Sequence, residues 1–133
     1  MTATPETFIE AWIDDLKSQP TITSLLCSPK EIREVEWQGS DFCYPNIRVA
    51  ITFRPSINRC GPDDADIEIE VFSAEKSSKQ ATHIASVIVG LYHGHAFESA
   101  GIKFNTVVVR EVTKPERSIY AWMVKVKIFT QGV

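Results

Sequence analysis

The sequence has few of the residues that usually carry chemistry: only three cysteines and three histidines in 133 positions. It also lacks an apolar run long enough to cross a membrane. The most apolar stretch, 81–92, contains Thr82, His83 and Ser86 and falls well short of the about 20 residues that a spanning helix needs. The first residues lack the basic start and apolar stretch of a secretory signal. We therefore expect no membrane contact and a protein made in a cytoplasm-like compartment.

The cysteines, Cys27, Cys43 and Cys60, are odd in number and widely separated. This spacing argues against a disulfide framework and lacks the paired pattern of a zinc site. A nucleophilic cysteine would need a nearby base, and no residue of the sequence is indicated for that role. We expect three free thiols.

The sequence also lacks a strong charge of either sign. It has 14 basic and 17 acidic residues, a net charge of -3, and no stretch where Lys and Arg gather with aromatics. This excludes tight DNA binding but not a surface beside which DNA slides. Glu68, Glu70, Asp63 and Asp64 are candidates for such a repelling wall.

What is present is the composition of one ordinary globular domain. Hydrophobic residues make up 44% and charged residues 23% of the chain, close to the averages for soluble domains. We find no internal repeat, low-complexity tract or linker, and 133 residues suffice for one buried core. Residues 1–133 are therefore predicted to be a single domain.

The first predicted element is a helix over 5–17. Thr4 can cap it, and Pro5 suits its first position. Between 21 and 29 the pattern is mixed and allows a short helical turn. The predicted buried face of the first helix consists of Ile9, Trp12, Ile13 and Leu16.

A second helix is predicted over 77–93, where Ser77 and Gln80 match a capping box and Gly94 can end the helix. Its apolar positions recur at helical spacing. They are Ala81, Ile84, Ala85, Ile88, Leu91 and Tyr92.

Alternating apolar and polar residues predict about five strands. The connection at 114–117 reads as a hairpin turn. The order helix, three strands, helix, two strands predicts an α+β fold, with the helices packed on a mainly antiparallel sheet. The predicted strands lie at 32–38, 47–54, 65–73, 104–113 and 119–130.

Two patterns could carry chemistry. His93 and His95, with Asp63 or Asp64, could hold a metal and leave open a small metal-dependent hydrolase. The aspartates lack the glycine and glutamate of a calcium loop, however, and a histidine cation at a helix end explains His93. No nucleophile elbow, phosphate loop or dinucleotide motif occurs. We expect no enzyme, no metal and no cofactor; a small-ligand-binding domain is a further alternative.

Docking features are more numerous. The stretch 55–64 is longer than a tight turn and rich in turn-forming residues, so it could form an arm toward a neighbour. Val87 and Val89 fall off the core face of the second helix and could line a subunit interface. The candidate residues of the assembly loop are Pro55, Ile57, Asn58, Arg59, Gly61, Asp63 and Asp64.

Three segments in order resemble one known family. FCYPNI at 42–47 enters a strand, DIEIEVFS at 66–73 precedes the second helix, and WMVKVKI at 122–128 closes the last strand. Together they are similar to the tail-terminator or tail-completion proteins of tailed bacteriophages, the lambda-like minor tail terminator group. The resemblance covers 42–130, about two thirds of the chain.

The resemblance implies a structural protein of the virion tail or neck, made in the host cytoplasm. Such a protein forms a homo-oligomeric ring, a hexamer, on the head-proximal end of the tail tube. It stops tail polymerisation and provides the surface where head or neck docks. The partners implied are the tail tube protein, head-tail connector proteins, and genomic DNA that passes through the lumen without specific binding. A different connector of the neck is the alternative within the virion.

Overall fold

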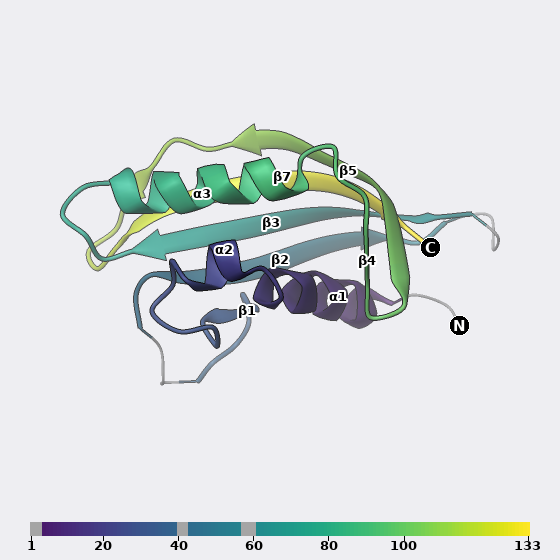
Figure 1. Ribbon diagram of the computed structural model, residues 1–133, viewed down its shortest axis with the longest axis horizontal. Coiled ribbons are helices and arrows are strands. Elements are labelled where there is room, and N and C mark those ends of the chain that lie inside the picture. Colours follow the sequence, from purple (N-terminus) through teal and green to yellow (C-terminus); the bar gives the residue numbers. More distant parts are fainter. Residues whose placement is uncertain (1–3, 40–42, 57–60) are drawn as a thin grey trace.

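The computed structural model describes residues 4–39, 43–56 and 61–133 (Figure 1). This part of the chain forms three helices and seven strands. Their bounds in chain order are α1 Pro5–Lys17, α2 Pro20–Thr23, β1 Ile32–Glu34, β2 Asn46–Arg54, β3 Asp63–Ser73, α3 Lys79–Tyr92, β4 Phe97–Ser99, β5 Ile102–Val112, β6 Glu116–Arg117 and β7 Trp122–Gly132.

The strands form one sheet in the order β1-β2-β3-β7-β5-β4, and β6 pairs with β7. β1 runs parallel to β2, whereas the other described pairs are antiparallel. The predicted α+β class and mainly antiparallel sheet are therefore confirmed. The sheet has seven strands rather than about five, because β4 and β6 are too short for alternation to reveal them.

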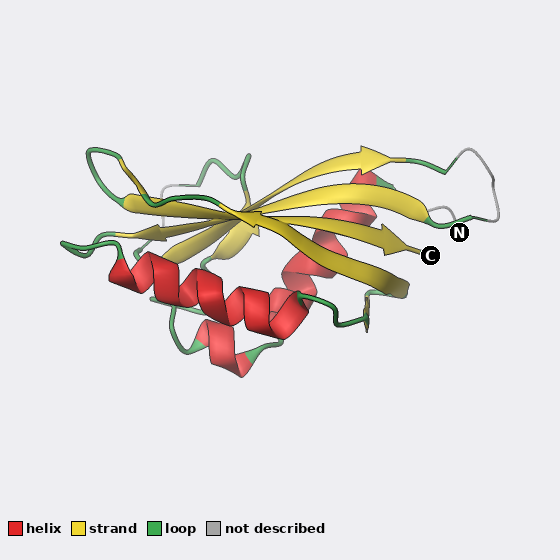
Figure 2. Cartoon of the chain, turned by 90° about the horizontal axis from the view of Figure 1, so that it is seen from above, coloured by secondary structure: helices red, strands yellow, loops and turns green. Residues whose placement is uncertain are grey.

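The helices lie on one face of the sheet, and the other face is open (Figure 2). β3 displays the division most clearly, since every second residue from Ala65 to Ser73 is buried and the residues between them are partly exposed. The long central strands β3 and β7 pair over their full eleven residues. The predicted alternation of this part of the chain is thus confirmed.

α1 begins where the sequence predicts. The Thr4 hydroxyl accepts a hydrogen bond from the Thr7 amide at 3.2 Å, and the Thr7 hydroxyl accepts one from the Thr4 amide at 2.8 Å. The predicted buried face was wrong in part, because Ile9 and Ile13 are only half-buried. The ring of Phe8 packs edge-on against other aromatic rings and turns that side of the helix inward. The buried residues of α1 are Phe8, Ala11, Trp12 and Leu16.

α3 differs from its prediction at the start. Its N-cap is Ser78, and the expected capping box does not form. Gln80 instead accepts a hydrogen bond from the Ser73 hydroxyl at the end of β3, which ties the helix to the sheet. The predicted end is confirmed, since Gly94 has a φ of 74°, a conformation that glycine adopts without strain.

The core centres on rings between α1, α3 and β5. Trp12 lies 5.1 Å from Tyr92 and 5.8 Å from Phe104, measured between ring centroids. The Tyr92 hydroxyl donates to Asp15 Oδ2 at 2.6 Å. Burial, together with this hydrogen bond, raises the pKa of Tyr92 above its ordinary value. The two helices and the sheet are thereby joined in one core.

Candidate assembly surfaces

The predicted assembly loop is only partly a loop. β2 ends at Arg54 and β3 already begins at Asp63, so Asp63 and Asp64 belong to a strand. Their carboxylates are engaged within the chain: Asp63 Oδ1 accepts from the Ser56 amide at 2.7 Å, and Asp64 Oδ1 from Gln131 Nε2 at 2.8 Å. Strand pairing with β2 and β7 overrode the turn signal of these aspartates. Pro55 and Gly61 lie among the described residues; Ile57, Asn58, Arg59 and Cys60 lie outside them.

Val87 and Val89 both lie on α3, as predicted. Their side chains are half-buried and pack against the core cluster. Part of each valine side chain therefore remains exposed to solvent. Their role at an interface stays a prediction.

His93 blocks the outer edge of β5. Its Nδ1 accepts a hydrogen bond from the Val109 amide at 3.0 Å, and the Gly94 amide donates to the Val107 carbonyl at 2.8 Å. His93 lies at the helix end as predicted, since it is the C-cap of α3 and its amide donates to the Val89 carbonyl, and its side chain in addition contacts the strand. Covering an edge in this way discourages pairing with another strand.

The described residues do not assemble the metal site that the sequence left open. They contain no group of three or more His, Cys, Asp or Glu side chains placed to hold a metal ion. The histidine and the aspartate lie apart along β7: His93 accepts from the Val109 amide, and Val109 pairs with Ile128, whereas Asp63 pairs with Gly132 at the end of β7.

None of the described helices is long and apolar enough to span a bilayer.

The open face of the sheet carries charges of both signs. Glu68 and Glu70 lie beside Lys125 and Lys127 in the register of β3 and β7. Their surface is therefore balanced in charge, unlike the uniformly repelling wall for which they were candidates. Burial raises the pKa of Glu70, and the hydrogen bond from Arg54 lowers that of Asp66. The ion pairs are Arg54–Asp66 at 2.8 Å, Lys125–Glu68 at 3.9 Å and Lys127–Glu111 at 3.4 Å.

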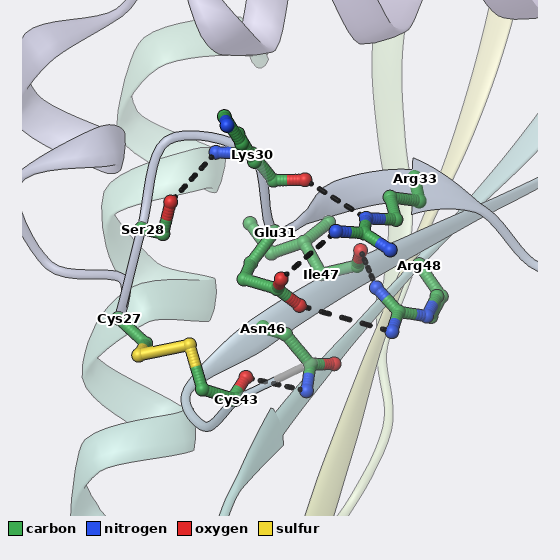
Figure 3. Close-up of polar contacts among 9 residues, drawn as sticks. All are labelled: Cys27, Ser28, Lys30, Glu31, Arg33, Cys43, Asn46, Ile47 and Arg48. Carbon is green, nitrogen blue, oxygen red and sulfur yellow. Dashed lines mark hydrogen bonds and ion pairs between the residues drawn. A yellow bond between two sulfur atoms is a disulfide. The ribbon is translucent and has the colours of Figure 1, made fainter. Parts of the chain in front are cut away.

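A charged cluster joins β1 to β2 (Figure 3). Glu31 is only 3% exposed and lies 3.1 Å from Arg33 Nη2 and 3.9 Å from Arg48 Nη2. The Arg33 guanidinium stacks 3.5 Å from the ring centroid of Trp37, under which Gly39 leaves room that a Cβ would fill. Burial lowers the pKa of Arg48. Two buried atoms of the cluster, Glu31 Oε2 and Arg33 Nη1, find no hydrogen-bond partner among the described residues.

The first strand is shorter than predicted, and the charged cluster explains why. β1 stops at Glu34 instead of continuing to 38. The Val35 amide still donates to the Val49 carbonyl, but the Trp37 amide turns back to Glu34. Stacking on Arg33 took Trp37 out of the alternation, because a cation over the ring replaces burial in the core.

The expectation of three free thiols was wrong. Cys27 and Cys43 form a disulfide, with their Cα atoms 5.9 Å apart (Figure 3). The Cys27 amide also donates to the Pro45 carbonyl, and Asn46 Nδ2 donates to the Cys43 carbonyl. These contacts bring together two connections that are separated in sequence. Cysteine spacing alone does not reveal such proximity.

Sequence reasoning missed the turn that follows β6. It placed 119–130 in a strand, with Tyr120 on the buried side, but β7 begins only at Trp122. Ile119 is 85% and Tyr120 77% exposed. The Ser118 hydroxyl, which accepts from the Ala121 amide at 3.2 Å, closes a turn there. Ser118, four residues before the start of β7, was the available signal.

Comparisons with known proteins agree with this fold. No family model matches the sequence, and no curated protein matches it. A solved chain from the "Virion of native gene transfer agent (GTA) particle" superposes with a TM-score of 0.74 at 10% identity, over 93% of this chain and 92% of its own. A second solved chain has a TM-score of 0.63 at 14% identity, over 96% and 92%. At these identities the likeness establishes a shared fold.

Proposed function

We propose that this chain is a structural virion protein of the tailed-phage type and that it acts as a tail terminator. In this role it forms a homo-oligomeric ring, a hexamer, on the head-proximal end of the tail tube. The ring stops tail polymerisation and offers the surface on which head or neck proteins dock. Genomic DNA passes through its lumen without specific binding.

The observation that carries the proposal is the likeness of nearly the whole fold to a chain of the gene transfer agent virion. It is supported by the ordered segments at 42–47, 66–73 and 122–128, which resemble the terminator family. The chemistry of the described residues agrees, because the best catalytic candidate, His93, is used to cover a strand edge. We therefore propose a protein that acts through assembly and not as an enzyme.

Electron microscopy tests the function directly. Purified protein mixed with tail tubes of its own particle should form rings on one end of each tube and prevent further growth of the tube. Rings on the head side of a neck that already carries a terminator would instead indicate the connector role. A gene located between head-completion and tail tube genes agrees with the proposal, whereas a location in a metabolic operon contradicts it.

A further inference from the structure

The turn between β6 and β7 presents two large apolar side chains to solvent. We call Ile119 and Tyr120, which are 85% and 77% exposed, the apolar tip. The Ser118 amide donates to the Ala121 carbonyl at 2.9 Å, and Ala121 is itself buried. These contacts close the backbone of the turn, which reduces the backbone entropy lost on binding. Tyrosine and large apolar residues in such a position are typical of binding hot spots.

Basic residues outnumber acidic ones in the segments next to the apolar tip. Arg117 lies next to it, with its guanidinium 5.8 Å from the ring centroid of Trp122, whose indole nitrogen faces the Lys76 carbonyl at 3.5 Å. Four cations against two carboxylates leave an excess of two positive charges at this end of a chain whose net charge is -3. The charges are Lys76, Lys79, Lys114 and Arg117, against Glu75 and Glu116.

One side of α1 carries negative charges next to half-buried apolar residues. Glu6, Glu10 and Asp14 are exposed and follow one another at four-residue spacing, so they line one side of the helix. Ile9 and Ile13 lie beside them and are only half-buried. None of the three carboxylates takes part in an ion pair with a described residue. We call these five residues the acidic strip; its like charges repel one another in the free chain.

We infer that the apolar tip of one copy docks on the acidic strip of the next copy. This inference rests on the proposed ring-forming function and names the contact between its subunits. The tip lies at the end of the sheet away from the N-terminus, where α1 begins (Figure 1). Two different surfaces of one chain that fit each other make a head-to-tail contact, which closes into a ring when the rotation permits. Ile119 and Tyr120 then cover Ile9 and Ile13, while the four cations at the tip's end of the sheet neutralise the carboxylates.

A charge exchange in the full-length chain tests the contact by sedimentation velocity over a concentration series. Ile119→Ser with Tyr120→Ser should weaken self-association by at least about tenfold. Lys114→Glu with Arg117→Glu should also weaken it, and adding Glu6→Lys with Glu10→Lys to the same chain should restore it. Val108→Ser, at a position 39% exposed on the open face, is the matched control and should leave association unchanged.

Site-specific cross-linking identifies the partner. A Tyr120→Cys chain mixed with an Ile13→Cys chain, both carrying Cys60→Ser, should give disulfide-linked pairs of the two variants, and Val108→Cys mixed with Ile13→Cys should not. Equal yields in both mixtures, no self-association at any concentration, or failure of the exchanged charges to restore it would each overturn the contact.

The same chains on tail tubes separate this inference from the function itself. If the Ile119→Ser, Tyr120→Ser chain forms rings on tube ends as well as the wild type does, the proposed contact is wrong and the terminator function is still supported. If the wild-type protein binds no tube end, the proposed terminator function is wrong.

Discussion

The two faces of the sheet use alternating residues of the same strands, yet they differ in what surrounds them. On the helix-covered face of β3, Ile67, Ile69 and Val71 are fully buried, whereas Glu68 and Glu70 between them face the open side. Burying an aliphatic side chain stabilises a protein by about 1.5–3 kcal/mol, while an exposed ion pair contributes about 1 kcal/mol or less. The covered face therefore holds the fold together, and the open face is free to change with little loss of stability.

The largest expected effect compares two phenylalanines on the two faces. Phe104→Ala should lower the free energy of unfolding by about 3–5 kcal/mol, because Phe104 is fully buried against Phe8 and Trp12. Phe129→Ala should cost about 1 kcal/mol or less, since this ring lies on the open face under Arg110. Urea denaturation measures both, and equal losses would break the comparison.

A pair of glycine substitutions gives the next effect. A Cβ at Gly132 would come within 2.9 Å of Phe8 Cζ and 3.0 Å of Phe104 Cδ1, so Gly132→Ala should destabilise the chain by about 1–3 kcal/mol. Gly90, on α3, has open space at that position. Gly90→Ala should therefore stabilise the chain by about 0.5–1 kcal/mol. Thermal unfolding of the two variants should shift in opposite directions, and a shared direction would contradict the packing described.

The hydrogen bond between Tyr92 and Asp15 tests a polar contact under the covered face. Tyr92→Phe keeps the ring and removes the hydroxyl that donates to Asp15 at 2.6 Å. We expect a loss of about 1 kcal/mol in urea unfolding. Asp15→Asn is the matched variant, because its amide can still accept the bond and should cost less. A larger loss for Asp15→Asn would show that the charge, and not the bond, matters.

The smallest effect concerns a carboxylate of the open face. Because burial raises the pKa of Glu70 above 4.5, the folded state binds this proton more readily than the unfolded chain. The ionised carboxylate therefore opposes folding at neutral pH. This cost fades as the pH falls through the raised pKa and is gone below the ordinary pKa. Glu70→Gln should stabilise the chain slightly at pH 7, by less than about 1 kcal/mol, and not at pH 3.

Glu68→Gln is the control for that comparison. Glu68 lies on the same open face, and its Oε2 is 3.9 Å from Lys125 Nζ. Its substitution should leave stability unchanged or slightly lower at pH 7. Stabilisation by Glu68→Gln but not by Glu70→Gln, measured by urea denaturation at both pH values, would reverse the assignment.

The parts of the fold that could be predicted share one property: the pattern that reveals them is local. α1 has its cap and Pro5 in adjacent positions, and β3 alternates between apolar and acidic residues from Ala65 to Val71. The candidate docking residues were less predictable. Asp63 and Asp64 read as turn residues, and only their pairing with β7 shows that they extend a strand.

Other features escaped prediction because they join distant residues. The Cys27–Cys43 disulfide depends on two connections that the sheet brings together. The contact of His93 with Val109 depends on the helix returning beside β5. The apolar tip was missed for a related reason, since Ile119 and Tyr120 continue the alternation of the strand after them, and only the closed turn at Ser118 places them in solvent.

By itself, the sequence determined the class of the fold, the two long helices, the central strands and the absence of a recognisable catalytic motif. These follow from hydrophobic periodicity and short-range capping, which act between neighbours in the chain. Only the tertiary structure decided which face of α1 is buried, which cysteines pair and which apolar residues stay exposed. Those outcomes depend on how the helices sit on the sheet, because burial, close contact and exposure are properties of residues that meet across the fold.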